Sequence, residues 1–237
     1  MAEVQPRPFC ATVLAMTRQI EFTSDELYHI YNRGTEKRIV FISCADYERF
    51  LMLMYLCNQE ERLDERIHRQ TFRQALECPR GAPLVDIVAY CLMPNHFHLI
   101  LREISGNGIS RFMQRVITGY TMYFNKKHER SGALFQGRFK AVHVQNDRYL
   151  QYLMAYIHLN PTALTKTFEK NILESAIHAF KQYQYSSYLD YIGVSRPENA
   201  LVDKHALPGY LSNPGEFKKH IQEWFDIKLT LGKSGRG

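Results

Sequence analysis

The chain has 237 residues, 45% of them hydrophobic and 23% charged, which describes a globular protein of one large domain, or one domain with an extension, and excludes a disordered or fibrous chain. Its formal net charge of +6 favours an anionic partner such as nucleic acid. No apolar run approaches the roughly twenty residues of a membrane span, so no membrane association is expected.

The cysteines and the first residues indicate where the protein acts. Five cysteines are scattered without a Cys-x-x-Cys pair, which indicates reduced thiols and a cytoplasmic protein rather than a disulfide framework. Residues 1–22 are predicted to form a disordered arm, because their apolar run is too short for a signal peptide and follows two prolines. Met16 is a candidate for the natural start of translation.

The first part of the chain is predicted to form a strand and then a helix. Residues 28–32 are rich in strand-forming side chains and are followed by a glycine. Ser43 with Asp46 three residues later resembles a capping box, and apolar side chains then recur at helical spacing. The charged residues 59–80 are expected to form an exposed helical extension and loop.

The middle of the chain is predicted to hold a hairpin, a long helix and a fourth strand. Only a short turn separates the apolar residues 84–92 from the strand 96–102, which implies an antiparallel hairpin. An apolar stripe over 109–124 predicts a long helix that ends within residues 125–130, and 138–144 alternates as a strand. The succession strand, helix, strand, strand, helix, strand is the ferredoxin-like split βαβ arrangement. We therefore expect an α+β fold, with an antiparallel sheet and helices on one of its faces.

A further helix is predicted from residues 147 to 160, where a proline follows. A step of about 100° per residue places Tyr149, Tyr152, Tyr156 and Asn160 in one stripe, beside an apolar stripe. Tyrosines at this spacing are usually core residues with their hydroxyls at the boundary, and this interpretation is favoured for Tyr149 and Tyr152.

The C-terminal extension, residues 171–237, is predicted to contain a short amphipathic helix over 217–225 and a disordered tail. The Gly-Lys-Ser-Gly-Arg-Gly ending is not a phosphate-binding loop, because it lacks the upstream glycine spacing and a following helix. No nucleotide cofactor is expected.

Two histidines are the most informative feature of the sequence. In a strand, His96 and His98 leave the same face, while Phe97 points the other way into apolar packing. This spacing aims two imidazoles at one point, as in half of a metal site. Alternatively, the histidines are only a hydrogen-bonded or half-exposed pair, since imidazole finds partners easily.

Three motifs together resemble one family. They are Met93-Pro94-Asn95-His96-Phe97-His98-Leu99, Ser131-Gly132-Ala133-Leu134-Phe135-Gln136-Gly137-Arg138-Phe139-Lys140 and Tyr156-Ile157-His158-Leu159-Asn160-Pro161. In order and spacing, over roughly residues 25–195, they resemble the single-tyrosine HUH transposases, and among these the REP-associated tyrosine transposases. That family has a ferredoxin-like core, in agreement with the order of elements above.

The resemblance implies roles for four residues. His96 and His98 would be metal ligands, Tyr156 the nucleophile and Asn160 the third ligand, a position where related transposases often carry Gln. It also implies a transposase catalytic domain over 23–170. The implied reaction is metal-dependent cleavage and rejoining of single-stranded DNA near REP-like hairpins, through a 5′-phosphotyrosine. Because the substrate supplies hard phosphate oxygens, the expected cofactor is Mg²⁺, with Mn²⁺ able to substitute.

Basic side chains near these motifs are candidates for phosphate contacts, although each one singly is more often a solvated surface charge. Arg138 and Lys140 are the best of them, because they lie inside the second motif. The full set is Arg33, Lys37, Arg38, Arg111, Arg115, Lys126, Lys127, Arg138 and Lys140.

Two other functions stay open. A non-catalytic module that binds single-stranded or hairpin nucleic acid would use the same sheet and aromatics, but it leaves the histidine pair and Tyr156 without a joint purpose. A metal hydrolase would activate water at the histidines. It needs a third strong ligand and a carboxylate base, and neither the histidine motif nor the tyrosine motif contains an acidic residue. The oligomeric state is also open.

Overall fold

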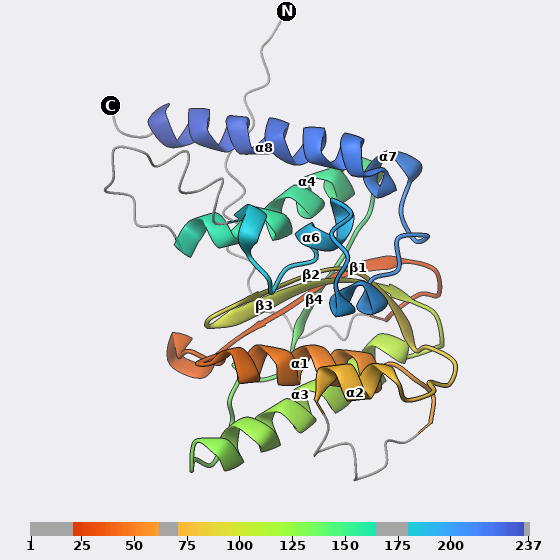
Figure 1. The fold of residues 1–237 in the computed structure, drawn as a ribbon, viewed down its shortest axis with the longest axis vertical. Coiled ribbons are helices and arrows are strands. Elements are labelled where there is room, and N and C mark those ends of the chain that lie inside the picture. Colours follow the sequence, from red (N-terminus) through yellow and green to blue (C-terminus); the bar gives the residue numbers. More distant parts are fainter. Residues whose placement is uncertain (1–20, 62–70, 165–179, 235–237) are drawn as a thin grey trace, which may run out of the picture.

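A computed structural model describes residues 21–61, 71–164 and 180–234. It shows a sheet between two helical layers (Figure 1). The strands are β1 Leu27–Arg33, β2 Val85–Met93, β3 His96–Glu103 and β4 Lys140–His143. The α-helices are α1 Cys44–Leu56, α2 Phe72–Leu76, α3 Gly108–Lys127, α4 Asp147–His158, α6 Tyr188–Tyr191, α7 Gly209–Ser212 and α8 Pro214–Ser234. Short 3-10 helices span Thr35–Lys37, Asn160–Leu164 and Pro197–Leu201.

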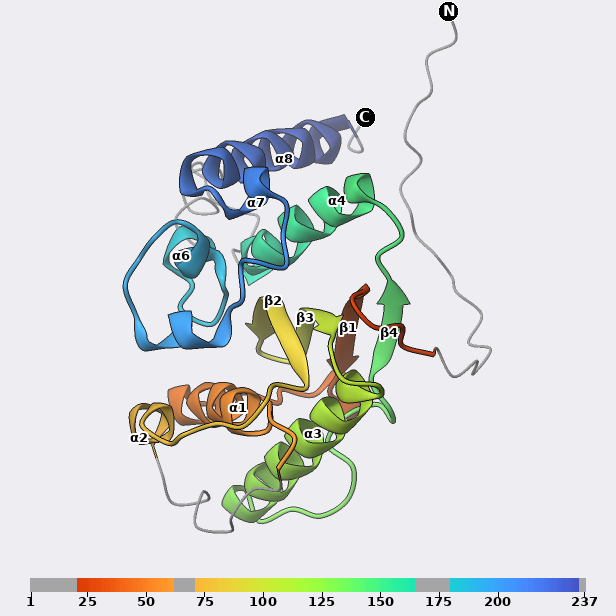
Figure 2. The ribbon, with the colours of Figure 1, turned by 90° about the vertical axis from the view of Figure 1, so that its right-hand side faces the viewer.

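The sheet has the order β2-β3-β1-β4, and every neighbouring pair of strands is antiparallel. Figure 2 shows the four strands side by side in this order. β1 thus lies between β3 and β4, with α1 in the connection from β1 to β2 and α3 in that from β3 to β4, which is the ferredoxin-like arrangement. The predicted α+β fold is confirmed.

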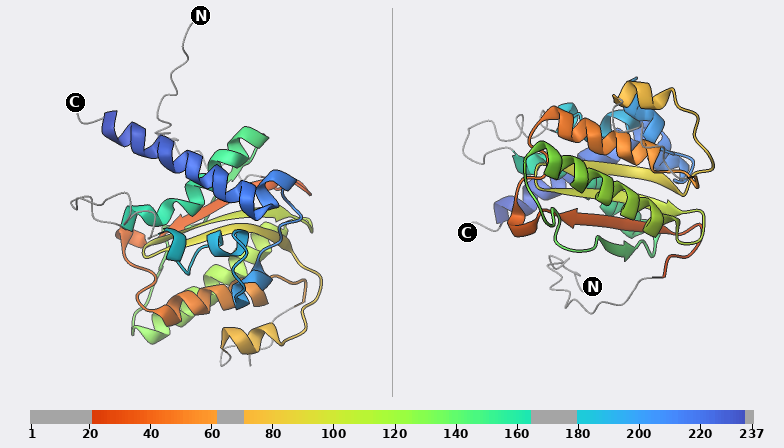
Figure 3. Two further views of the ribbon diagram at one scale, coloured as in Figure 1. Left: turned by 45° about the horizontal axis from the view of Figure 1, so that its top comes forward. Right: turned by 90° about the horizontal axis from the view of Figure 1, so that it is seen from below.

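One face of the sheet is covered by α1 and α3 (Figure 3). Together with the strands they form a buried core that includes Phe50, Phe97 and Tyr120. α1 begins at the predicted capping box, in which the Ser43 backbone N–H donates to the Asp46 carboxylate at 2.8 Å. Phe97 therefore packs on the face opposite to the two flanking histidines, as the two-residue period of a strand requires.

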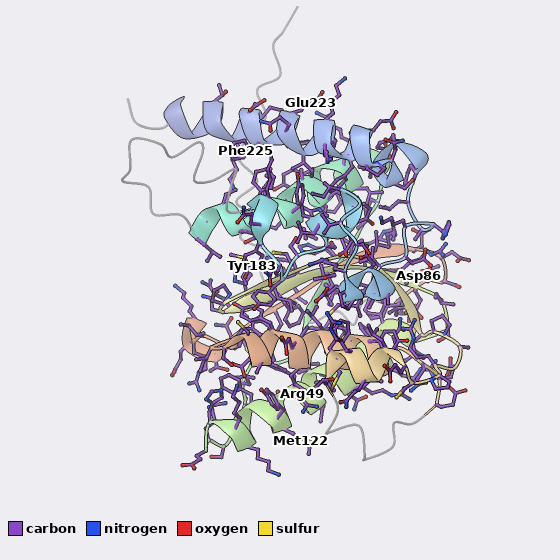
Figure 4. All side chains as sticks on the ribbon, in the orientation of Figure 1. Arg49, Asp86, Met122, Tyr183, Glu223 and Phe225 are labelled. Atoms are coloured by element: carbon purple, nitrogen blue, oxygen red, sulfur yellow. The ribbon has the colours of Figure 1, made fainter. Side chains whose placement is uncertain are left out.

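The other face of the sheet is covered by α4 and α8 (Figure 1). A second core joins Cys91 and Ile100 of the sheet to Leu153 of α4 and to Phe225 of α8. Phe225 lies on the inner side of α8, whereas Glu223 lies on its outer side (Figure 4). The C-terminal extension thus shares its core with α4 and the sheet.

Two predicted helix boundaries differ from those observed. α4 ends at His158, and Asn160 opens a 3-10 helix instead of closing α4. The cause is Pro161, which lacks a donor N–H and disfavours the α conformation in the residue before it. The helix predicted over 217–225 is part of the longer α8, Pro214–Ser234. The prediction covered only the apolar stripe, and the residues on both sides of it are helical as well.

Several predictions fall partly outside the described residues. These are the N-terminal arm up to residue 20, residues 62–70 of the charged extension and the tail from residue 235. Among the described residues, no disulfide bond joins Cys44, Cys57, Cys78 and Cys91 to one another. No helix in the described ranges combines the length and apolarity needed to cross a bilayer.

His158 is expected to make the stability of the fold depend on pH. It is fully buried, with Nδ1 2.7 Å from the Met154 carbonyl oxygen and Nε2 2.8 Å from Ser187 Oγ. Burial lowers the pKa of His158 to about 4, so below the ordinary pKa the unfolded chain binds more protons than the folded one. The contribution of His158 to the free energy of unfolding should be constant above about pH 7 and fall by roughly 3 kcal/mol towards about pH 4. Denaturant titrations measure this fall, and an equal fall in His158→Gln would contradict the assignment.

Candidate active site

The two histidines of β3 point to the face of the sheet that α4 covers. Their ring centroids are 5.0 Å apart, and His98 is only 7% exposed. Both Nδ1 atoms are engaged: that of His96 lies 2.6 Å from Asn95 Oδ1, and that of His98 lies 2.9 Å from His29 Nε2. Each ring is thus fixed through Nδ1, which leaves Nε2 as the atom able to bind a ligand.

Tyr156 reaches the histidines from the last turn of α4. Its ring centroid lies 5.3 Å from that of His98 and 6.4 Å from that of His29, edge-on in both cases. The side chain is nevertheless 41% exposed, so a substrate can reach it. Asn160 follows one turn later and lies close enough to Tyr156 and His96 to influence the pKa of each. The structure therefore brings together all four residues implied as catalytic or metal-binding.

The Tyr156 hydroxyl is a neutral phenol in the free protein. Burial raises the pKa of Tyr156, the neighbouring Tyr152 adds to this, and the hydrogen bond with Asn160 opposes it. A phenol becomes an efficient nucleophile only when a base or a nearby cation helps to remove its proton. Tyr156 therefore needs assistance from another group before it can attack a phosphate.

The histidines are neutral as well. Burial lowers the pKa of His98 well below the ordinary value, and the neighbouring His29 and His96 add to the effect. Burial also lowers the pKa of His96, with a contribution from Arg33, while the interaction with Asn160 raises it. Neutral imidazole is the form that binds metal ions. Both side chains are therefore in the ligand-competent state at neutral pH.

His29 belongs to the same cluster, although the motif pattern does not include it. It lies on β1, is 7% exposed and contacts His98 directly. Burial lowers the pKa of His29 to about 4. Sequence reasoning misses this residue because β1 and β3 become neighbours only in the folded sheet. The one available signal is the ferredoxin-like order itself, which places β1 beside β3.

Most of the site lies in a part of the chain that matches a known family model. Residues 51–160 match the family model described as "Transposase IS200 like". This part of the chain is therefore similar to the IS200-like transposases. The matched stretch includes His96, His98 and Tyr156 and ends at Asn160. The family recognised from the sequence motifs is thereby confirmed.

Among solved structures, the chain is similar to one described as "Structure of the REP associates tyrosine transposase bound to a REP hairpin". The two chains are 13% identical, with a TM-score of 0.48, and the comparison covers 78% of this chain and 90% of that chain. None of the curated protein sequences compared with the chain matches it.

The donors of this IS200-like site suit a divalent cation that is bound partly by substrate. Two neutral imidazoles and the Asn160 amide lie together, and both imidazole rings are fixed through Nδ1. Within the described residues, no three His, Cys, Asp or Glu side chains are grouped so as to hold a metal alone. A closed zinc site made by the protein is therefore not formed, and phosphate oxygens and water would complete the shell of a harder cation.

Two of the predicted phosphate contacts lie near the site, and a third lies two residues before one of them in the sequence. Arg33 pairs with His96 across the β1–β3 ladder, and Lys140 pairs with Tyr31 across the β1–β4 ladder. Arg138 lies just before β4, and both it and Lys140 are exposed. Of the neighbouring candidates, Arg38 pairs with Glu36 within its own loop and Lys37 is exposed.

The other predicted phosphate contacts lie on α3, in the opposite helical layer (Figure 2). Arg111 pairs with Glu60 at 2.5 Å. Arg115 donates to the backbone carbonyls of residues 59–61. Lys127 pairs with the buried Asp46 at 2.7 Å, and Lys126 is exposed beside it. These pairs tie α3 to α1 and to the residues that follow α1, so the structure does not bring this group to Tyr156.

Proposed function

We propose that the protein is a single-stranded DNA transposase and endonuclease that cleaves and rejoins strands near REP-like hairpins through a 5′-phosphotyrosine. The observation that carries this proposal is the approach of Tyr156 to His98, 5.3 Å between ring centroids, from elements more than fifty residues apart. The IS200-like family match supports the transposase class. Hairpin DNA as the partner and the cytoplasm as the location follow from the motif resemblance and the cysteine pattern.

The proposed chemistry is a reversible exchange of phosphate esters. The Tyr156 oxygen attacks a backbone phosphate, the bond to the 3′ oxygen breaks, and the strand ends as a 5′-phosphotyrosine and a free 3′-hydroxyl. A second 3′-hydroxyl then attacks the phosphotyrosine and releases the phenol, so the strands rejoin without ATP or water. His96, His98 and Asn160 would hold Mg²⁺ or Mn²⁺, and the bound cation would polarise the phosphate and stabilise the leaving 3′ oxygen. Arg33 and Lys140 would neutralise neighbouring phosphates.

The test is an incubation of labelled single-stranded hairpin DNA with the protein and Mg²⁺. We expect a covalent protein–DNA adduct that survives denaturation, with an equal amount of fragment ending in a 3′-hydroxyl. Cleaved DNA without any adduct would instead support a metal hydrolase. Binding without cleavage at any tested hairpin or metal would support a non-catalytic module.

Charge changes should separate the two groups of basic residues. Reversal of Arg138 and Lys140 to Glu is expected to weaken DNA binding and to flatten its salt dependence, because fewer counterions are then released. Lys127→Ala should keep the salt slope and lower the free energy of unfolding by about 1 kcal/mol, because the buried Asp46 carboxylate loses a donor. Anisotropy titrations at several salt concentrations and denaturant unfolding measure the two effects. If Lys127→Ala flattened the salt dependence of DNA binding more than the reversal of Arg138 and Lys140, the assignment of these residues to two groups would be contradicted.

A further inference from the structure

Three tyrosines form a row along α4 that ends at the proposed nucleophile. The ring centroids of Tyr149 and Tyr152 are 6.3 Å apart, and those of Tyr152 and Tyr156 are 6.0 Å apart, with nearly parallel planes in both pairs. The sequence interpretation of Tyr152 as a core residue is wrong, since it is 41% exposed, as exposed as Tyr156. The apolar stripe of α4 takes the sheet-facing side, which leaves Tyr152 at the edge of the packed surface.

The only tryptophan of the chain, Trp224 on α8, meets this row from the side. Its ring centroid lies 5.4 Å from that of Tyr152, with the planes 66° apart. Contacts on both sides fix its place: His220 Nε2 lies 2.9 Å from the Gln151 carbonyl oxygen, and Lys228 Nζ lies 2.8 Å from Thr162 Oγ1. Trp224 therefore belongs to the α4–α8 contact and stands beside the site.

Both rings carry a polar group without a hydrogen bond among the described residues. In the described ranges, neither the Tyr152 hydroxyl nor the Trp224 indole N–H makes a hydrogen bond. Aromatic rings beside basic side chains are a means by which proteins hold single strands, because every nucleobase offers a π face. Tyr152 lies four residues, about 6 Å along the helix axis, from Tyr156, within reach of the base next to a phosphate held there.

We propose that Tyr152 and Trp224 form a stacking site for the nucleobase that flanks the phosphate attacked by Tyr156. The choice of a nucleobase as occupant rests on the proposed function, and the place of the site rests on the geometry of the rings. Stacking on these rings accepts any base, so the site would position the strand and would not select its sequence.

The single tryptophan makes the test specific to this site. The Tyr156→Phe protein is titrated with single-stranded oligonucleotides, while anisotropy reports binding and Trp224 fluorescence reports stacking. We expect quenching that follows binding, an affinity about 5- to 100-fold lower in Tyr152→Ala, and recovery in Tyr152→Phe. An oligonucleotide with an abasic site at the flanking position should bind the Tyr156→Phe protein more weakly, by the same factor as the Tyr152→Ala substitution. The same abasic site should not lower the affinity further when Tyr152 is already Ala. The control is Met122→Ala, a side chain 64% exposed on α3 in the opposite layer (Figure 4).

The outcomes separate this inference from the proposed function. Binding without any change in Trp224 fluorescence, and with Tyr152→Ala as tight as the parent, would overturn the stacking site and leave the transesterification untouched. The parent measurement alone decides this point if Tyr152→Ala does not fold. Quenching and an abasic effect, without adduct formation by the wild-type protein, would support the stacking site and refute the proposed function. Quenching that follows protein concentration without DNA would assign the surface to a second copy of the chain and overturn the inference.

Discussion

Tyr156→Phe is expected to abolish DNA cleavage and the covalent adduct while leaving DNA binding intact. The substitution removes only the hydroxyl, and the ring that packs 5.3 Å from His98 is kept. Loss of a covalent nucleophile typically lowers a rate by about 10⁴-fold or more, so no product should be visible on the time scale of the wild-type reaction. Denaturing gels of labelled hairpin DNA measure cleavage and adduct, and anisotropy measures binding.

The matched control is Tyr152→Phe. Tyr152 lies one turn earlier on the same helix and has the same exposed fraction as Tyr156, and this change also removes one phenol hydroxyl. We expect it to form the adduct at nearly the wild-type rate. An adduct that persists in Tyr156→Phe would refute the assignment, and mass spectrometry of its DNA-linked peptide would then identify the true nucleophile.

Features that depend only on residues close together in the chain could be predicted from the sequence. The capping box of α1 needs only Ser43 and Asp46, and it forms as expected. The two-residue period of a strand places His96 and His98 on one face, and the four-residue spacing of a helix places Tyr156 near Asn160. The order of strands and helices follows from such local patterns, because short connections leave few ways to assemble them.

Features that depend on distant contacts could not be predicted. His29 looks like one more strand residue until β1 pairs with β3. The exposure of Tyr152 depends on how far α8 covers α4, which no local pattern states. The basic residues show the same limit, because Lys127 and Lys140 are alike in sequence, yet one pairs with the buried Asp46 and the other is exposed on β4. Composition predicts that cations exist, and only the fold decides which of them already have partners.

His29→Leu is expected to weaken Mn²⁺ binding by about 10- to 100-fold, the usual effect of losing the group that orients a histidine ligand. A ligand imidazole offers its Nε2 lone pair only when the proton sits on Nδ1. For His98 the partner of Nδ1 is His29 Nε2 at 2.9 Å, so in the proposed metal-bound state His29 would accept that proton and hold the ring in the binding tautomer. Free Mn²⁺ measured by electron paramagnetic resonance, with Tyr156→Phe protein and bound DNA, reports affinity without any turnover.

Two variants decide whether His29 acts through this hydrogen bond or only through packing. His29→Gln keeps a side-chain acceptor in reach of His98 and should recover part of the affinity, whereas His29→Leu fills similar space without an acceptor. His143→Gln is the control, because His143 lies on β4 with its Nε2 2.9 Å from the Glu26 carboxylate, outside the histidine cluster. Nitrogen chemical shifts of His98 should show protonation at Nδ1 in the wild-type protein and a mixture of tautomers in His29→Leu. Equal Mn²⁺ affinity in the Leu and Gln variants would leave His29 a packing residue, and the orientation of His98 would then have to come from the strand alone.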